Sequence, residues 1–122
     1  MSVQALIVAA GRGSRSGIGY NKVYYLLNGC CVLSHSIRAM AASGLFDGIT
    51  VVISREDEAL FDEKLRQDGT RGLVRAIAYG GATRQESVYN GLCALPEDTA
   101  LVAIHDGARP YVRDEFVSVQ LA

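Results

Sequence analysis

Residues 9–17, with the sequence Ala-Ala-Gly-Arg-Gly-Ser-Arg-Ser-Gly, combine glycines and cationic side chains in one short segment. The segment follows a fully apolar run, residues 5–8, which is typical of a loop that leaves a buried strand. Its glycines allow a sharp turn and a close approach to a ligand, and Arg12, Arg15 and Lys22 can bring positive charge to the same loop. This composition suits a polyphosphate, although a basic surface turn would have the same composition.

The spacing of this loop excludes two common phosphate-binding motifs. The dinucleotide-binding pattern G-x-G-x-x-G requires a glycine where Ser16 stands, and the Walker A pattern requires one directly before the lysine, where Asn21 stands. An NAD-dependent enzyme is further disfavoured because Ser54, rather than an acidic residue, follows the second apolar run. The loop therefore predicts a different kind of phosphate site.

Two further polar segments also follow predicted strands. In the first, Gly80 and Gly81 precede a capping box formed by Thr83 and Glu86, so we predict a helix that begins at Arg84. Free amides at a helix N-terminus can recognise a base edge or a phosphate. A glycine pair can equally serve only as a tight connection.

The second polar segment, residues 105–110, follows the apolar run 101–104 and contains Asp106 and Arg109. A carboxylate is a suitable ligand for Mg²⁺, and an arginine can bind a phosphate. The alternative is that Asp106 caps a turn and pairs with Arg109. We expect His105 to point into the fold rather than to bind a metal.

Apolar runs near residues 5, 49, 73 and 101 alternate with helical patterns. This alternation predicts an α/β domain with a mostly parallel sheet, right-handed crossovers and helices on both faces. Because the carboxyl ends of parallel strands meet at one edge of a sheet, we expect the three polar segments to gather there.

Local signals predict the connecting elements in the first part of the chain. A β-prone run at residues 23–27, closed by Asn28 and Gly29, predicts a short hairpin. Ser34 is expected to cap the next helix, which ends at Gly44. The apolar positions of that helix are Ile37, Met40 and Ala41.

In the middle of the chain, Ser54 is expected to cap a helix that is stopped by Asp68 and Gly69. The inward pair of that helix is Phe61 and Leu65.

The remaining elements have weaker signals. Residues 73–78 predict a strand that Arg75 interrupts, which favours an edge position. The helix that begins at Arg84 has the apolar stripe Val88, Leu92 and Leu95. Asp114 is expected to cap a last helix, with the apolar positions Phe116, Val117 and Leu121.

Composition bounds the class of protein. A length of 122 residues predicts one domain, and a net charge of −1 gives no indication of a nucleic-acid groove or an anionic membrane surface. No apolar run approaches the roughly 20 residues that span a bilayer, and no signal-like segment is present, so we expect a cytoplasmic protein. The cysteines, an odd set without C-x-x-C spacing, argue against a disulfide framework or a zinc site and predict small buried or half-buried thiols at Cys30, Cys31 and Cys93.

Taken together, the glycine-rich loop with Lys22, the segment from Gly80 to Val88 and the segment 105–110 resemble the 2-C-methyl-D-erythritol 4-phosphate cytidylyltransferases. The likeness runs through essentially the whole chain, with the motifs in the family's order. It implies a Rossmann-like nucleotidyltransferase fold that joins CTP to a sugar-alcohol phosphate, methylerythritol phosphate, and releases pyrophosphate in the presence of Mg²⁺.

The resemblance also implies residue roles. Arg15 and Lys22 would contact the triphosphate and stabilise the charge that develops around the α-phosphorus, whereas Arg12 would be a solvated neighbour. Asp106 would bind Mg²⁺ and the sugar-phosphate side, and Arg109 would help to hold the acceptor. The resemblance further implies that Ala9, Ala10, Gly81 and Ser87 would read the cytosine. The other residues implied to surround the nucleotide are Gly11 and Gly13.

Two departures from the family pattern are visible. Tyr20 and Asn21 precede Lys22 where the family commonly has proline, and full family members continue well beyond residue 122. That continuation includes an arm that completes a homodimer and residues that bind the acceptor phosphate. We therefore expect residues 1–122 to form a single nucleotide-binding domain that lacks the family's C-terminal part.

Two alternatives follow from this resemblance. A ribitol-5-phosphate cytidylyltransferase is disfavoured because Ala9-Ala10-Gly11 and Gly107-Ala108-Arg109-Pro110 are closer to the methylerythritol form. A non-catalytic CTP-binding fragment is the second alternative.

Overall fold

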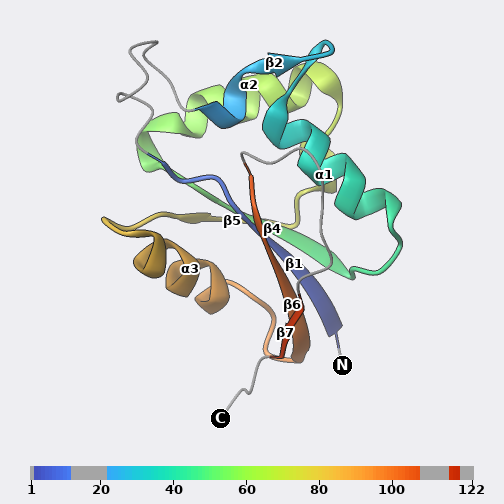
Figure 1. The fold of residues 1–122 in the computed structure, drawn as a ribbon, viewed down its shortest axis with the longest axis vertical. Helices are drawn as coiled ribbons and strands as arrows, with labels where there is room; N and C mark the ends of the chain where they lie inside the picture. Colours follow the sequence, from blue (N-terminus) through green and yellow to red (C-terminus); the bar gives the residue numbers. More distant parts are fainter. Residues whose placement is uncertain (1, 12–21, 108–115, 119–122) are drawn as a thin grey trace.

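The computed structural model describes residues 2–11, 22–107 and 116–118, and its centre is a five-stranded sheet with the order β5-β4-β1-β6-β7 (Figure 1). Strands β5, β4, β1 and β6 are parallel, and β7 is antiparallel to β6. The strands of this sheet are β1 (Ser2–Val8), β4 (Gly48–Ile53), β5 (Ala76–Tyr79), β6 (Thr99–Asp106) and β7 (Phe116–Ser118). The mostly parallel sheet predicted from the sequence is confirmed.

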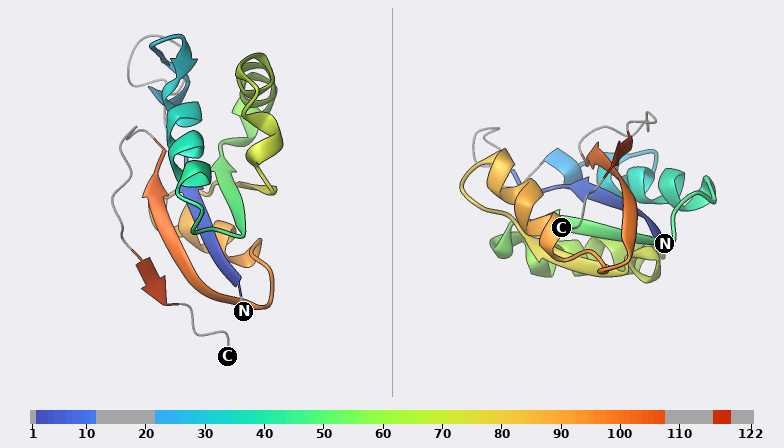
Figure 2. Two further views of the ribbon diagram at one scale, coloured as in Figure 1. Left: turned by 90° about the vertical axis from the view of Figure 1, so that its right-hand side faces the viewer. Right: turned by 90° about the horizontal axis from the view of Figure 1, so that it is seen from below.

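Helices cover both faces of the sheet, as predicted. Helices α1 (Val32–Ala42) and α2 (Glu58–Asp68) stand side by side on one face, and α3 (Arg84–Cys93) lies on the other (Figures 1 and 2). Short 3₁₀ turns connect several elements, namely η2 (Lys22–Tyr24), η3 (Arg55–Asp57) and η4 (Arg71–Leu73). Within the described ranges, no helix is long and apolar enough to cross a membrane.

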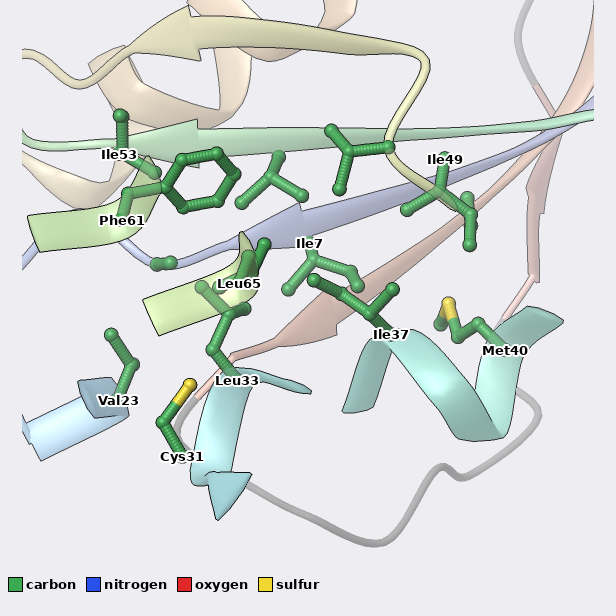
Figure 3. Close-up of a cluster of buried hydrophobic side chains, with 14 of the residues drawn as sticks. Ile7, Val23, Cys31, Leu33, Ile37, Met40, Ile49, Ile53, Phe61 and Leu65 are labelled. Atoms are coloured by element: carbon green, nitrogen blue, oxygen red, sulfur yellow. The ribbon is translucent and has the colours of Figure 1, made fainter. Parts of the chain in front are cut away.

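The pleat of the strands divides the core into two clusters. On β1, Ala5 and Ile7 pack toward α1 and α2, whereas Leu6 packs toward α3, because successive side chains point to opposite faces. The cluster on the α1 and α2 face also contains the predicted pair Phe61 and Leu65, both fully buried (Figure 3).

Helix α1 begins earlier than its sequence predicts. Its N-cap is Cys31, not Ser34, and its predicted apolar position Ala41 is exposed, whereas Ile37 and Met40 are buried. Ser34 lies inside the helix, where its hydroxyl forms hydrogen bonds with Cys31 Sγ (3.1 Å) and Thr70 Oγ1 (3.2 Å). A long-range partner therefore satisfies the hydroxyl that we expected to cap the helix.

The predicted hairpin is present but short. Strands β2 (Leu26–Leu27) and β3 (Cys30–Cys31) are antiparallel, and Asn28 and Gly29 between them have φ values of 53° and 88°. Two successive positive φ angles are the requirement of a type I′ turn, which explains the Asn-Gly pair. The preceding residues of the β-prone run form η2 instead of strand.

Two predictions for the remaining elements need correction. Strand β5 covers Ala76–Tyr79 rather than residues 73–78, although it does lie at the edge of the sheet. Phe116–Ser118 is strand β7, so the predicted helix over these residues is wrong. The β-prone Phe116 and Val117 pair with Ala103 and Val102, and the exposed edge of β6 supplies their backbone partners. Asp114 and Leu121 lie outside the described residues.

Candidate functional site

The carboxyl ends of the four parallel strands are joined by backbone hydrogen bonds. The amide of Ala9 donates to Val52 O (2.7 Å), that of Gly107 donates to Val8 O (2.9 Å), and that of Gly80 donates to Ile53 O (2.8 Å). The described parts of the three polar segments therefore share one edge of the sheet. Chain connections leave β1 toward β4 on one side and return to β6 on the other, which is the type of position where open α/β sheets bind ligands.

Gly80 brings two of the predicted nucleotide-binding residues together. A Cβ atom at this position would overlap Ala10 Cβ and would lie 2.9 Å from Ser87 Oγ. The amide of Gly81 donates to Ser87 Oγ at 3.1 Å. Ala10, Gly81 and Ser87 thus form one contiguous group around Gly80. The sequence feature that indicates this close packing is the pair Gly80-Gly81.

The N-terminus of α3 has fewer free amides than its sequence predicts. Thr83 caps the helix as predicted, with Oγ1 accepting from Glu86 N at 3.1 Å. Glu86 Oε2 accepts from Ala82 N at 2.8 Å, where a reciprocal capping box would use Thr83 N. Since the amides of Gly81, Ala82 and Glu86 already have side-chain acceptors, a ligand here would meet an ordered loop.

The apolar stripe of α3 is also displaced from its predicted positions. Val88, Leu92 and Leu95 are only partly buried. The buried residues of the helix are Ser87 and Gly91.

Ser54 supports the glycine-rich loop, a role that its sequence position did not indicate. Its hydroxyl makes no capping hydrogen bond to η3, which separates it from the start of α2 at Glu58. Instead, Ser54 Oγ accepts from Gly11 N and donates to Gly11 O, both at 3.3 Å. The predicted cap is therefore wrong, and the hydroxyl fixes the first part of the loop.

Lys22 is exposed at the start of η2, and the two residues that follow it are buried. Val23 is 3% exposed and Tyr24 is fully buried in the α1 and α2 cluster. Burial raises the pKa of Tyr24, and the charges of Asp57 and Cys31 add to the shift, so its hydroxyl stays neutral. The burial of Val23 and Tyr24 holds the backbone of Lys22 in place, while the side chain of Lys22 is exposed.

Asp106 ends β6 beside Val8 of β1 and is half-buried. His105 is buried, as predicted. Within the described ranges, no group of three or more His, Cys, Asp or Glu side chains could hold a metal. Magnesium is commonly held by one or two carboxylates together with substrate phosphates, and a single carboxylate at this edge is compatible with that mode.

Some of the predicted site residues belong to segments outside the described part of the chain. Gly13, Arg15 and Arg109 lie outside the described residues, as does Arg12. Their roles stay predictions. The residues that the structure does bring to the sheet edge are Ala9, Ala10, Gly11, Gly81, Ser87 and Asp106.

Comparison with known proteins gives a consistent result. A 2-C-methyl-D-erythritol 4-phosphate cytidylyltransferase of Desulforamulus reducens is 42% identical over 117 residues, which cover 96% of this chain and 50% of that protein. The corresponding protein of Pelotomaculum thermopropionicum is 44% identical over 108 residues, 88% of this chain and 45% of that one. The chain thus spans about half the length of these relatives.

Structural similarity agrees with the sequence relationship. The crystal structure of 4-diphosphocytidyl-2C-methyl-D-erythritol synthase from Anaerococcus prevotii superposes with a TM-score of 0.72 at 29% identity, over 90% of this chain and 45% of that chain. The model of the 2-C-methyl-D-erythritol 4-phosphate cytidylyltransferase family matches residues 3–122. The chain therefore belongs to the 2-C-methyl-D-erythritol 4-phosphate cytidylyltransferase family.

Proposed function

We propose that this chain forms the CTP-binding part of a cytidylyltransferase that moves CMP from CTP to 2-C-methyl-D-erythritol 4-phosphate and releases pyrophosphate. Family membership supports the reaction. The position proposed for the nucleotide rests on the close approach of Gly80 to Ala10 and Ser87 at the carboxyl edge of the sheet. A small-residue floor of this kind gives a flat base room to approach the backbone.

In the proposed reaction, an oxygen of the acceptor phosphate attacks the α-phosphorus of CTP, and the bond to the β-phosphate oxygen breaks. The acceptor is already an anion, so no general base is required. Lys22 and Arg15 would bind the triphosphate and offset the charge that develops during transfer. Ala9, Ala10, Gly81 and Ser87 would hold the cytosine, with Gly11 and Gly13 shaping the loop. Arg109 would position the acceptor.

Magnesium is part of the proposal, with Asp106 as its protein ligand. A bound Mg²⁺ would neutralise phosphate charge. Asp106 would hold this ion from the end of β6, on the side where the acceptor binds. A homodimer is also a proposal, which rests on the family resemblance, and so is the cytoplasmic location expected from the sequence.

Calorimetry with CTP and Mg²⁺ tests the nucleotide site through two matched substitutions. Gly80→Ala should weaken CTP binding by about tenfold, a loss of about 1.4 kcal/mol, because the added methyl group displaces Ala10 or Ser87. Gly72→Ala is the control, since a Cβ there meets nothing within 4 Å. Equal CTP affinities in the two variants would overturn the site.

A pyrophosphate-release assay with methylerythritol phosphate or ribitol phosphate tests the reaction. Lys22→Gln should lower the rate by about 10²–10³-fold, the usual effect of losing one electrostatic stabiliser. Arg66→Gln, an exposed cation on α2, is the control. Faster turnover of ribitol phosphate would favour the alternative acceptor, and CTP binding without turnover would favour a non-catalytic CTP-binding fragment.

A further inference from the structure

A cavity of about 270 Å³ opens between the β2–β3 hairpin and helices α1 and α2. Its lining includes the side chains of Cys30 from the hairpin, Arg38 from α1, and Lys64 and Gln67 from α2. The cavity is large enough for a ligand of several non-hydrogen atoms, since one water molecule occupies about 30 Å³ in the liquid. No role in CTP chemistry uses any of these residues.

The lining of this cavity is positively charged. Arg38 Nη1 donates to Cys30 Sγ at 3.0 Å, and its Nη2 donates to Asp68 O at 2.6 Å. Asp68 also lines the cavity, and its Oδ1 accepts from Thr70 N (3.0 Å) and Thr70 Oγ1 (2.6 Å), which are neutral donors. The lining thus carries two cations, Arg38 and Lys64, against one carboxylate, which leaves it net positive, and Lys64 has no ion pair with any residue that the structure describes.

Cys30 is the more exposed of the two cysteines that line this cavity. It is half-buried and free, whereas Cys31 beside it is buried and Cys93 is exposed on α3, across the sheet. Partly exposed cysteines in electropositive surroundings are the ones that react with electrophilic sulfur. Cys30 combines this environment with an adjoining space in which a reagent can bind.

We propose that this cavity binds small anionic disulfides, such as a peptide disulfide that carries carboxylates, and that Cys30 exchanges with them. In the exchange, the Cys30 sulfur forms a new bond to one sulfur of the disulfide, the original S–S bond breaks, and the second half leaves as a thiolate with the bonding electron pair. The Cys30 proton passes to solvent. The disulfide itself is the oxidant, and Cys30 ends as a mixed disulfide.

Charge selectivity distinguishes this site from an ordinary surface thiol. Arg38 and Lys64 would raise the local concentration of an anion but not of a neutral molecule, and added salt would weaken the effect. Gln67, which has no hydrogen bond to any described residue, can donate to a bound carboxylate. Cys93 offers a comparison thiol in the same molecule.

The test compares two aromatic disulfides that differ in charge, 5,5′-dithiobis(2-nitrobenzoate) and the neutral 4,4′-dithiodipyridine. Tandem mass spectrometry of tryptic peptides after timed quenching gives the rates at Cys30 and Cys93, because fragmentation distinguishes Cys30 from Cys31 on their shared peptide. We expect the ratio of the anionic to the neutral rate to be about fivefold higher at Cys30 than at Cys93, the factor for about one unit charge at contact distance in water. Raising the ionic strength from about 0.01 M to about 1 M should remove most of that difference.

Two charge-matched variants complete the design. Lys64→Gln should lower the ratio at Cys30 about fivefold without changing the ratio at Cys93. Arg66→Gln removes the same charge from a position two residues away, on a different face of α2, and should leave both ratios unchanged. Arg38→Gln should have the largest effect, but Lys64→Gln is the decisive variant if Arg38→Gln does not fold.

Equal ratios at the two cysteines, or equal effects of the two α2 variants, would overturn the proposal. Neither measurement requires CTP turnover.

Discussion

The two faces of the sheet are packed in different ways. The face under α1 and α2 is filled by large side chains that are fully buried, such as Tyr24, Phe61 and Leu33. The face under α3 has a small buried cluster, and the buried residues of the helix itself are Ser87 and Gly91. Most of the buried apolar side chains thus lie on the face under α1 and α2, whereas α3 packs close to the other face of the sheet through small residues.

The close approach of α3 has a direct consequence for the candidate site. A Cβ atom on Gly91 would lie 2.6 Å from Leu6 Cδ1 and 2.7 Å from Val52 Cγ2, so the helix axis comes nearer to the sheet than a larger residue would allow. Ser87 lies one turn earlier on the same side of the helix, against Gly80. The packing at Gly91 therefore sets the position of Ser87. In this molecule, large buried side chains stabilise the fold and small ones position the proposed nucleotide site.

The largest expected effect lies on the α1 and α2 face. Phe61→Ala should lower the free energy of unfolding by about 3–5 kcal/mol, because it removes a fully buried ring and leaves a cavity. Urea unfolding followed by circular dichroism measures this loss. Leu45→Ala is the control, since Leu45 is 53% exposed and should change stability by less than about 0.5 kcal/mol. A loss below about 1 kcal/mol at Phe61 would mean that the apolar face does not dominate stability.

A smaller change is expected from Gly91→Ala on the α3 face. The methyl group would push against Leu6 and Val52 at a cost of about 1–3 kcal/mol, which the better helix propensity of alanine offsets by about 1 kcal/mol. CTP affinity should nevertheless fall, because α3 must move and Ser87 moves with it. Calorimetry on the folded variant measures this. If Gly91→Ala and Phe61→Ala changed CTP affinity equally, the division of roles between the two faces would be wrong.

The sequence predicts the elements whose signals are local and repeated. The β-branched run 49–53 lies within β4, and Asn28-Gly29 forms the predicted turn, because strand burial and positive φ angles depend on those residues themselves. The prediction fails where a polar side chain has a distant partner. Ser34 resembles a cap, but its hydroxyl forms a hydrogen bond with Thr70, 36 residues away.

The same distinction applies to the candidate site. Gly81 and Asp106 could be found because they directly follow strands, and the parallel topology brings them to one edge. Ser54 could not be recognised as a partner of Gly11, since 43 residues separate the two and Ser54 also precedes a helical pattern. On α3, a search for apolar periodicity selects Val88 and overlooks Gly91, because a close approach needs the absence of a side chain.

The smallest predicted effect concerns the polar contacts of Asp68 on α2 with Ser34 and Arg38 on α1, and it depends on pH. Burial raises the pKa of Asp68, but hydrogen bonds from Ser34 and Thr70 and the charge of Arg38 outweigh burial and hold it below its ordinary value near 3.8. A carboxyl whose pKa is lowered by folding stabilises the folded state above its unfolded pKa and loses that contribution as pH falls through its folded pKa. Urea unfolding between about pH 6 and pH 3 should therefore show a decline in stability below about pH 4 that is shallower in Asp68→Asn. Glu63→Gln, at an exposed position of α2, should keep the decline of the unmodified chain, and identical profiles for all three proteins would show that Asp68 does not couple α2 to α1.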